Sequence, residues 1–294
     1  MTSLAVSIEF LSHTIEEYDF SSRPLIVGIS GPQGSGKSYL TDKLAEELRQ
    51  KYPGKKVISF SMDDLYLTHK EQSQLNERAI TEYDNNLLLQ GRGLPGTHDI
   101  DLGLDILNNL IALSKQDSKI TEVRIPSYDK AAFNGEGDRD EAKWKTVNYK
   151  VDIVLFEGWF NGFVPLDNDQ LRVKYLTSDP SSILQRSKLP DLELVNEFLH
   201  NYTKIWDLFD RFIFLRTSSI DNVYKWRIEQ EHNLIKAMGT GMSDQQVVNF
   251  VNRYMPLYHL YYENMCDNGV LRARDGNLRI SIDEKRVIVE TSIF

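Results

Sequence analysis

Eight consecutive residues near the start of this chain have the types and the spacing of a phosphate-binding loop, G-x-x-x-x-G-K-S. They are Gly31, Pro32, Gln33, Gly34, Ser35, Gly36, Lys37 and Ser38. Glycine allows left-handed backbone and a close approach to a ligand, so the N–H groups of the loop can converge on an anion. In such a loop the lysine reaches the outer phosphates of a nucleotide and the serine hydroxyl ligates Mg²⁺. The alternative is a glycine-rich turn that fits by chance, which we expect in about one per cent of chains of this length.

The loop pattern indicates a phosphate site only between a buried strand and a helix, and the sequence predicts both. Residues 24–30 are an apolar, β-branched run typical of a strand that is covered on both faces. After the loop, Leu40, Leu44 and Leu48 recur at helical spacing until Pro53 ends the pattern. The N-terminus of this helix would add its own N–H groups to the anion site.

Carboxylates follow two further predicted strands. Residues 56–61 lead directly to Asp63 and Asp64, and residues 151–156 end at Glu157. Ligands of open α/β sheets bind beyond the carboxyl ends of the strands. Asp63 or Asp64 could accept the proton of a hydroxyl or hold Mg²⁺ through water, and Glu157 occupies the Walker B position of a metal-binding carboxylate. The structural alternatives are helix capping, a solvated turn, or a strand-end acid without a ligand.

The rest of the pattern predicts further helices, strands and loops around these elements. Helices are expected over residues 3–18, from an N-cap at Asp101, over 191–207 and 219–238, and from an N-cap at Ser243 into an aromatic-rich segment. Strands are expected over residues 120–125, 212–215, 278–282 and 287–291. Residues 68–100 are polar and glycine-interrupted, which predicts a long loop over the site, and residues 134–141 predict a surface loop.

The composition narrows the class of protein. The chain has 294 residues and a formal charge of −9, which argues against a nucleic-acid partner or an anionic membrane surface. Cys266 is the only cysteine, so no internal disulfide can form. The first residues lack the features of a signal or transit peptide, and no apolar run reaches bilayer length. We therefore expect a cytoplasmic protein, with nuclear access left open, and prefer a monomer although the sequence leaves the oligomeric state open.

Together these segments resemble the D-glycerate 3-kinase family of P-loop kinases, a group that includes phosphoribulokinase, uridine kinase and pantothenate kinase. The resemblance spans roughly residues 24–285. Besides the phosphate loop it rests on residues 61–66, 96–99, 126–130, 135–139, 155–159, 224–227 and 241–244. Within the family the chain looks most similar to a fungal ATP-dependent kinase of unassigned substrate.

The resemblance implies one α/β domain over residues 1–294, with a parallel P-loop NTPase-type sheet flanked by helices and a helical lid. Residues 1–20 would be an N-terminal helix, 67–145 the acceptor-side loops and insertion, and 219–242 the lid. The Walker B strand would lie beside the P-loop strand. ATP with Mg²⁺ would be the phosphoryl donor, and a small molecule would be the acceptor.

The resemblance also implies roles for single residues. Lys37 and Asp63 would be catalytic, with Asp63 as the base, and Ser38 and Glu157 would hold the metal. The remaining candidates are Arg227, as a lid arginine that meets the ATP phosphates, and an acceptor pocket of Asp64, Tyr66, His98, Tyr128, Lys130 and Arg139. A structural histidine at position 98 and solvated charges at positions 130, 139 and 227 are the plainer alternatives. The chain departs from plant-type glycerate kinases at Leu94, where they carry Asn, and at Lys225, where they carry Arg.

The sequence thus predicts an ATP-dependent kinase that phosphorylates a hydroxyl of a small metabolite, with glycerate or a similar hydroxy acid as the first candidate. A kinase for a nucleoside or a pantothenate-like acceptor is the nearest alternative. A nucleotide-binding regulatory protein without turnover is a second. A GTPase is disfavoured because no Asn-Lys-x-Asp segment occurs, and a dinucleotide enzyme because Tyr39 stands where G-x-G-x-x-G needs its third glycine.

Overall fold

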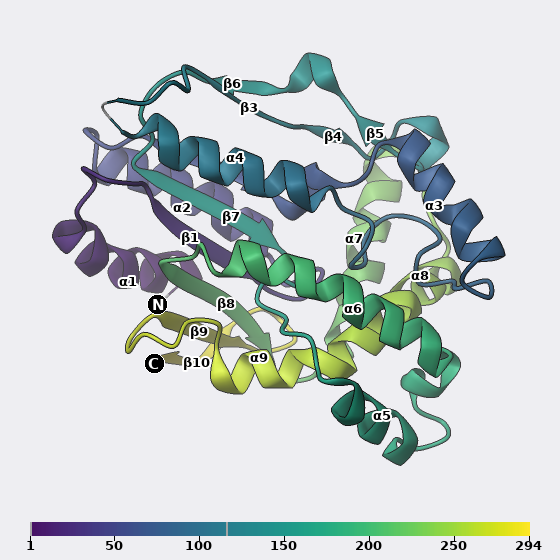
Figure 1. The fold of residues 1–294 in the computed structure, drawn as a ribbon. Coiled ribbons are helices and arrows are strands. Elements are labelled where there is room, and N and C mark those ends of the chain that lie inside the picture. The colour runs from purple at the N-terminus through teal and green to yellow at the C-terminus, as the bar shows by residue number, and fades with distance from the viewer. Residues whose placement is uncertain (1, 116) are drawn as a thin grey trace.

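A six-stranded sheet lies between two layers of helices in the computed structural model, which describes residues 2–115 and 117–294 (Figure 1). The strand order is β10-β9-β8-β1-β7-β2, and all neighbouring pairs are parallel except β9 and β10. The strands are β1 (Leu25–Ser30), β2 (Val57–Ser61), β7 (Ile153–Gly158), β8 (Arg211–Thr217), β9 (Asn277–Ile282) and β10 (Ile288–Ile293). The phosphate-loop strand β1 therefore pairs directly with the Walker B strand β7, as predicted.

The apolar run of β1 is buried on both faces because its side chains alternate between two cores. Leu25, Val27 and Ile29 join the core formed with α1 (Ser3–Glu17) and α2 (Lys37–Lys51). Ile26 joins the core on the opposite face. Figure 1 shows α1 and α2 over one face of the sheet and α4 (Ile100–Leu113) and α6 (Leu189–Trp206) over the other.

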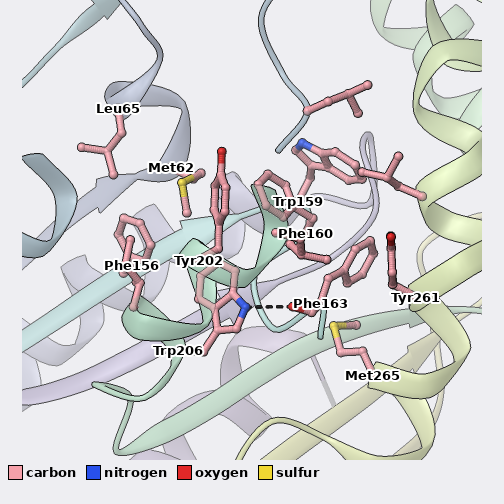
Figure 2. Close-up of a cluster of buried hydrophobic side chains, with 14 of the residues drawn as sticks. Met62, Leu65, Phe156, Trp159, Phe160, Phe163, Tyr202, Trp206, Tyr261 and Met265 are labelled. Carbon is pink, nitrogen blue, oxygen red and sulfur yellow. Dashed lines mark hydrogen bonds between the residues drawn. The ribbon is translucent and has the colours of Figure 1, made fainter. Parts of the chain in front are cut away.

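The core on the Ile26 face of the sheet contains an aromatic cluster next to the end of β7 (Figure 2). Trp159, Phe160 and Phe163 follow the strand, and Phe160 packs against Trp159, Phe163 and the α6 residues Tyr202 and Trp206. The Trp206 indole donates a hydrogen bond of 2.9 Å to the carbonyl oxygen of Phe163. Truncating one such buried ring to alanine costs about 3–5 kcal/mol, so the segment that carries Glu157 rests on a rigid base.

The other elements surround this framework. The helices are α3 (His69–Thr81), α5 (Asn168–Thr177), α7 (Asn222–Met238), α8 (Asp244–Leu257), a π-helical segment η5 (Tyr258–Tyr262) and α9 (Glu263–Asn268). Short 3₁₀ helices are η1 (Met62–Leu65), η2 (Phe133–Gly135), η3 (Glu141–Lys143) and η4 (Ile183–Arg186). Two small antiparallel ladders pair β3 (Val123–Ile125) with β6 (Lys145–Val147) and β4 (Tyr128–Asp129) with β5 (Asp138–Arg139). Within the described ranges, no helix has the length and apolar character needed to cross a bilayer.

The structure corrects three local predictions. Residues 68–100 are not one long loop, because α3 begins with a capping box between Thr68 and Glu71 and buries Leu75. Asp99, rather than Asp101, is the N-cap of α4, since its side chain accepts the N–H of Leu102. The strand expected over residues 120–125 covers only β3 and lies outside the main sheet.

Candidate active site

The phosphate loop connects β1 to α2, and two of its glycines adopt left-handed backbone for different reasons. Gly36, with φ of 93°, is the N-cap of α2, and a side chain there would meet no neighbour. Gly34, with φ of 80°, also lies so close to α7 that a Cβ would come within 2.5 Å of the Trp226 Cβ. The loop is thus shaped by conformation at one glycine and by close packing at the other.

Two side chains from distant parts of the sequence form hydrogen bonds with the backbone of this loop. The N–H of Gln33 donates to the Tyr258 hydroxyl at 3.0 Å. Arg286, between β9 and β10, donates from Nε to the carbonyl oxygen of Gly34 at 2.8 Å. Tyr258 is buried and Arg286 is half-buried, so both contacts restrict the movement of the loop.

Glu157 comes within reach of the loop because it is in register with Ile29 of β1. Its Oε1 accepts hydrogen bonds from the hydroxyls of Ser38 at 3.1 Å and Ser61 at 2.9 Å. The Nζ of Lys37 lies 3.9 Å from the other carboxylate oxygen, Oε2. That buried oxygen accepts no hydrogen bond from the described residues.

The oxygen atoms of the Ser38 hydroxyl and the Glu157 carboxylate are suitable ligands for Mg²⁺. Mg²⁺ in kinases is held by one or two protein oxygens together with substrate phosphates and water. The described residues contain no cluster of three or more His, Cys, Asp or Glu side chains suited to a metal. The unpartnered Oε2 of Glu157 and the adjacent Ser38 hydroxyl therefore match a site that is completed by phosphate.

Asp63 lies on the short helix η1, which directly follows β2. Its Oδ1 accepts the Tyr66 hydroxyl at 2.7 Å, and its Oδ2 lies 2.5 Å from the Nζ of Lys130. Burial acts to raise the pKa of Asp63, but the charge and hydrogen bond of Lys130, with help from Lys37 and Tyr66, lower it to about 2. Asp63 is thus a carboxylate at neutral pH.

Asp64 has a different environment from its neighbour. Its Oδ2 accepts the N–H of Ser61 at 2.9 Å, and this bond completes a capping box at the start of η1. Burial raises the pKa of Asp64. The geometry favours the capping interpretation for Asp64, because this bond holds the turn that presents Asp63.

The predicted pocket residues His98 and Tyr128 lie against the Tyr66 ring. The His98 ring centroid is 4.7 Å from that of Tyr66, and the Tyr128 centroid is 5.1 Å from it. His98 is buried with Nδ1 2.8 Å from the Tyr202 hydroxyl, and burial lowers its pKa to about 3, so it is neutral. Both residues thus support the side chain that holds Asp63.

Arg139 and Arg227 have partners within the chain. Arg139 donates to the Asp99 carboxylate at 3.0 Å and to the Tyr66 carbonyl oxygen at 2.9 Å. Arg227 lies on α7 with Nη1 2.5 Å from the Gln230 side-chain oxygen. Its guanidinium lies 5.2 Å from the centre of the Phe250 ring, and its buried Nε has no partner among the described residues.

Comparisons with known proteins bear on this arrangement. No family model matches the chain. The "Probable ATP-dependent kinase TDA10" of Saccharomyces cerevisiae is 40% identical over 293 residues, which cover 99% of this chain and 96% of that protein. The solved D-glycerate 3-kinase of Cryptococcus neoformans is 34% identical over the whole of both chains, with a TM-score of 0.88. The chloroplastic D-glycerate 3-kinase of Arabidopsis thaliana is 35% identical over 90% of this chain and 53% of its own length.

The chain belongs to the D-glycerate 3-kinase-like family of P-loop kinases. Membership confirms the predicted α/β fold with a mostly parallel sheet, and the predicted class of enzyme, an ATP-dependent phosphotransferase. The structure also shows the surroundings of Leu94 and Lys225, the two residues at which the chain is expected to differ from plant-type members. Leu94 is fully buried, and Lys225 of α7 forms an exposed ion pair of 2.8 Å with Glu284.

Sequence reasoning missed several residues that this kinase places at its site. Ser61 ends β2, as predicted, and its hydroxyl also donates a hydrogen bond to Glu157. Arg92 lies with its guanidinium 5.9 Å from the Tyr66 ring centre and 5.6 Å from that of Tyr128. Tyr258 is a buried core residue whose hydroxyl also accepts the N–H of Gln33 in the phosphate loop. No local pattern marks these residues, because their contacts join segments far apart in the chain.

Proposed function

We propose that this kinase transfers the γ-phosphoryl group of ATP to a hydroxyl of a small hydroxy acid, with D-glycerate as the first candidate. The observation that carries the proposal is the pair of Lys130 and Asp63, 2.5 Å apart on the acceptor side of the phosphate loop. Asp63 is suited to a hydroxyl and Lys130 to a carboxylate. D-Glycerate offers a carboxylate at C1 and a hydroxyl at C3, and it is the substrate in the names of two relatives.

The donor half is supported by the loop and by the side chains that converge on it. The N–H groups of the loop and of the first turn of α2 provide donors to phosphate oxygens. Lys37, whose side chain is only 15% exposed, would neutralise charge on the outer phosphates. Ser38 and Glu157 would hold Mg²⁺, which would supply positive charge to neutralise the terminal phosphates.

Asp63 and Lys130, the two charged residues proposed for the acceptor side, have separate roles. The hydroxyl oxygen of the acceptor forms a bond to the γ-phosphorus, and the bond from that phosphorus to the bridging oxygen of ADP breaks. The hydroxyl proton passes to Asp63. Lys130 is the main cause that lowers the pKa of Asp63 to about 2, so Asp63 becomes a stronger base when Lys130 pairs with the acceptor, and it also orients the hydroxyl.

Lys130 would change partner when the acceptor binds. In the structure it neutralises Asp63, and its side chain is 58% exposed, which leaves room for a second anion to approach. A carboxylate on the acceptor would draw Lys130 towards itself and free Asp63 for the hydroxyl. Tyr66 continues to hold the other oxygen of Asp63, so the carboxylate keeps its orientation.

Nucleosides and pantothenate-like molecules remain the alternative acceptors, and a protein without turnover the alternative function. The discriminating experiment measures ADP release from ATP and Mg²⁺ with D-glycerate, other hydroxy acids, uridine and pantothenate as acceptors. We expect release with a hydroxy acid and a new phosphate ester in the products. Release with uridine alone would overturn the acceptor assignment, and ATP binding without release from any acceptor would favour the regulatory alternative.

The Lys130→Met variant tests the acceptor assignment separately. We expect the KM for the hydroxy acid to rise at least about tenfold, because a charge-assisted contact is lost, while the KM for ATP stays unchanged. Lys143→Met is the matched control, since Lys143 is an equally exposed lysine of the same insertion, paired with Asp140. An unchanged KM in Lys130→Met would remove Lys130 from the pocket.

We further infer a single-domain cytoplasmic monomer that acts on small molecules and binds neither nucleic acid nor membranes. The formal charge of −9 supports this inference. The lone Cys266 is buried, and burial raises the pKa of its thiol to about 12, so it is an inert core residue. Gel filtration with light scattering tests the oligomeric state.

A further inference from the structure

One continuous helical segment contacts both halves of the candidate site. This segment, α8 with η5 (residues 244–262), lies beside α7 (Figure 1). One of its residues contacts the phosphate loop, and two others contact the acceptor-side loop of residues 88–93.

The donor end of the segment is Tyr258. Its hydroxyl accepts the N–H of Gln33 at 3.0 Å, within the phosphate loop itself. The ring is buried and lies edge-on to Trp159, with ring centres 5.0 Å apart. Burial raises the pKa of the hydroxyl, so the oxygen is a neutral acceptor. Because the ring is packed on the aromatic cluster, it fixes where the loop can lie.

The acceptor end is one turn earlier, at Arg253 and Tyr254. The Arg253 guanidinium donates to the carbonyl oxygens of Arg92 at 3.1 Å and Leu88 at 2.9 Å, and also to that of Gly91. The Tyr254 hydroxyl donates to the same Arg92 oxygen at 3.2 Å. Residues 88–92 are irregular backbone, so these bonds replace the partners that a helix or strand would provide.

Arg92 extends this support to Lys130. Its guanidinium donates to the carbonyl oxygen of Gly135 at 2.8 Å and to that of Glu136. A weaker contact of 3.4 Å reaches the carbonyl oxygen of Lys130, whose side chain binds Asp63. A continuous set of contacts therefore runs from α8 through residues 88–92 to the segment that presents Lys130.

The character of Arg253 argues against simple core packing. It is half-buried, none of the ion pairs among the described residues includes it, and its hydrogen-bond partners are backbone carbonyls, while its buried Nε has no partner among those residues. Burial lowers its pKa, but an arginine stays charged. Burying an unpaired charge is costly, and an apolar side chain would pack as well at lower cost. What an apolar side chain could not do is hold three carbonyl oxygens of one loop.

We propose that Tyr258 and Arg253 are positioning residues through which α8 and η5 set the placement of the phosphate loop relative to the acceptor-side segment. Tyr258 acts on nucleotide binding through Gln33. Arg253 acts on the acceptor side through residues 88–92 and Arg92. The inference rests on the proposed function for its meaning in the reaction, but both ends can be tested without knowledge of the acceptor.

Tyr258→Phe tests the donor end, because it keeps the ring and removes only the acceptor oxygen. We expect the dissociation constant for ATP with Mg²⁺, measured by calorimetry, to rise about threefold to tenfold through the loss of one hydrogen bond. Tyr262→Phe is the matched control. Its hydroxyl lies in the same π-helical segment and accepts the N–H of Thr217 at 2.8 Å rather than an N–H of the phosphate loop. We expect it to lower the melting temperature to a similar extent without changing ATP affinity.

Arg253→Met tests the acceptor end by hydrogen exchange on the full-length protein. We expect amides of residues 88–93 and 130–137 to exchange about tenfold faster, with ATP affinity unchanged. Arg279→Met is the control, because Arg279 is a largely buried arginine that donates to the Cys266 carbonyl oxygen at 3.2 Å, far from these loops in the chain. Arg253→Lys, which can satisfy fewer carbonyls, should give intermediate exchange and serves if the methionine variant does not fold.

The outcomes separate this inference from the proposed function. A wild-type protein that does not bind ATP would overturn the proposed function. Normal ATP binding with no difference between Tyr258→Phe and Tyr262→Phe would overturn the donor end of the inference. Unchanged exchange of residues 130–137 in both Arg253 variants would overturn the acceptor end.

Discussion

The Nζ of Lys130 lies 2.5 Å from the Oδ2 of Asp63, although 67 positions separate the two residues in the chain. The small ladder of β4 and β5 leads the chain back to η1 and brings them together. The pair places a cation beside a carboxylate that the Tyr66 hydroxyl also orients. In a protein with a charge of −9, this locally balanced site is where an anionic acceptor can approach.

Asp63→Asn should remove turnover and leave ATP binding unchanged. The amide cannot accept the hydroxyl proton, and loss of a general base lowers kcat by about 10²–10⁴-fold. Turnover is measured by acceptor-dependent ADP release and ATP binding by calorimetry. Asp101→Asn, an exposed acid in the first turn of α4, is the control. Full activity in purified Asp63→Asn would remove Asp63 from the role of base.

Lys37→Ala should abolish turnover, with a loss of at least about 100-fold in kcat, because the positive charge at the outer phosphates stabilises the transferring group. Lys43→Ala is the control on the same helix, where Lys43 forms an exposed pair of 2.7 Å with Glu46. A single-turnover assay at saturating ATP separates loss of chemistry from loss of binding. Comparable rates in the two variants would contradict the assignment of Lys37.

Glu157→Gln should raise the Mg²⁺ concentration that gives half-maximal activity by about tenfold, since one carboxylate charge in the metal site is lost. A readout without turnover is the gain in ATP affinity on adding Mg²⁺, which we expect to shrink in the variant. Glu46→Gln changes an exposed acid of α2 and is the control. If Mg²⁺ strengthens ATP binding equally in Glu157→Gln, Glu157 is not a ligand.

His98 should make the protein less stable as the pH falls. Its pKa is about 3 when folded and about 6.5 when unfolded, so between these values only the unfolded chain binds the proton. The free energy of unfolding should therefore fall by about 1.4 kcal/mol for each pH unit from 6.5 towards 3. Asp63 acts in a lower window, since its stabilising effect is present above the unfolded pKa of about 3.9 and is lost towards 2.

Urea unfolding of His98→Gln between pH 7 and pH 4.5 checks this prediction. The variant should show a shallower decline than the wild type, whereas exposed His200→Gln should decline like the wild type. Burial also lowers the pKa of His259, so the comparison of slopes isolates the contribution of His98. Parallel curves for His98→Gln and the wild type would show that the proton on His98 does not matter for stability.

The sequence by itself predicted the donor half of this protein. Residues 31–38 and Glu157 could be assigned because their chemistry depends on local order: a strand, a glycine-rich turn, a helix start and a strand-end acid. The apolar runs of β1 and β7 likewise predicted buried neighbouring strands, and the register of Ile29 with Glu157 bears out their pairing.

Only the tertiary structure shows which of the proposed acceptor-side residues come together and which other residues hold them in place. Asp63 and Asp64 are adjacent acids that sequence cannot tell apart, and only the turn of η1 directs one to Lys130 and the other to the N–H of Ser61. Arg92, Arg253 and Tyr258 carry no local signal, because each acts on backbone that lies far away in the chain. Local patterns report which elements form, whereas contacts between distant segments depend on how those elements pack, and the packing is set by the whole core at once.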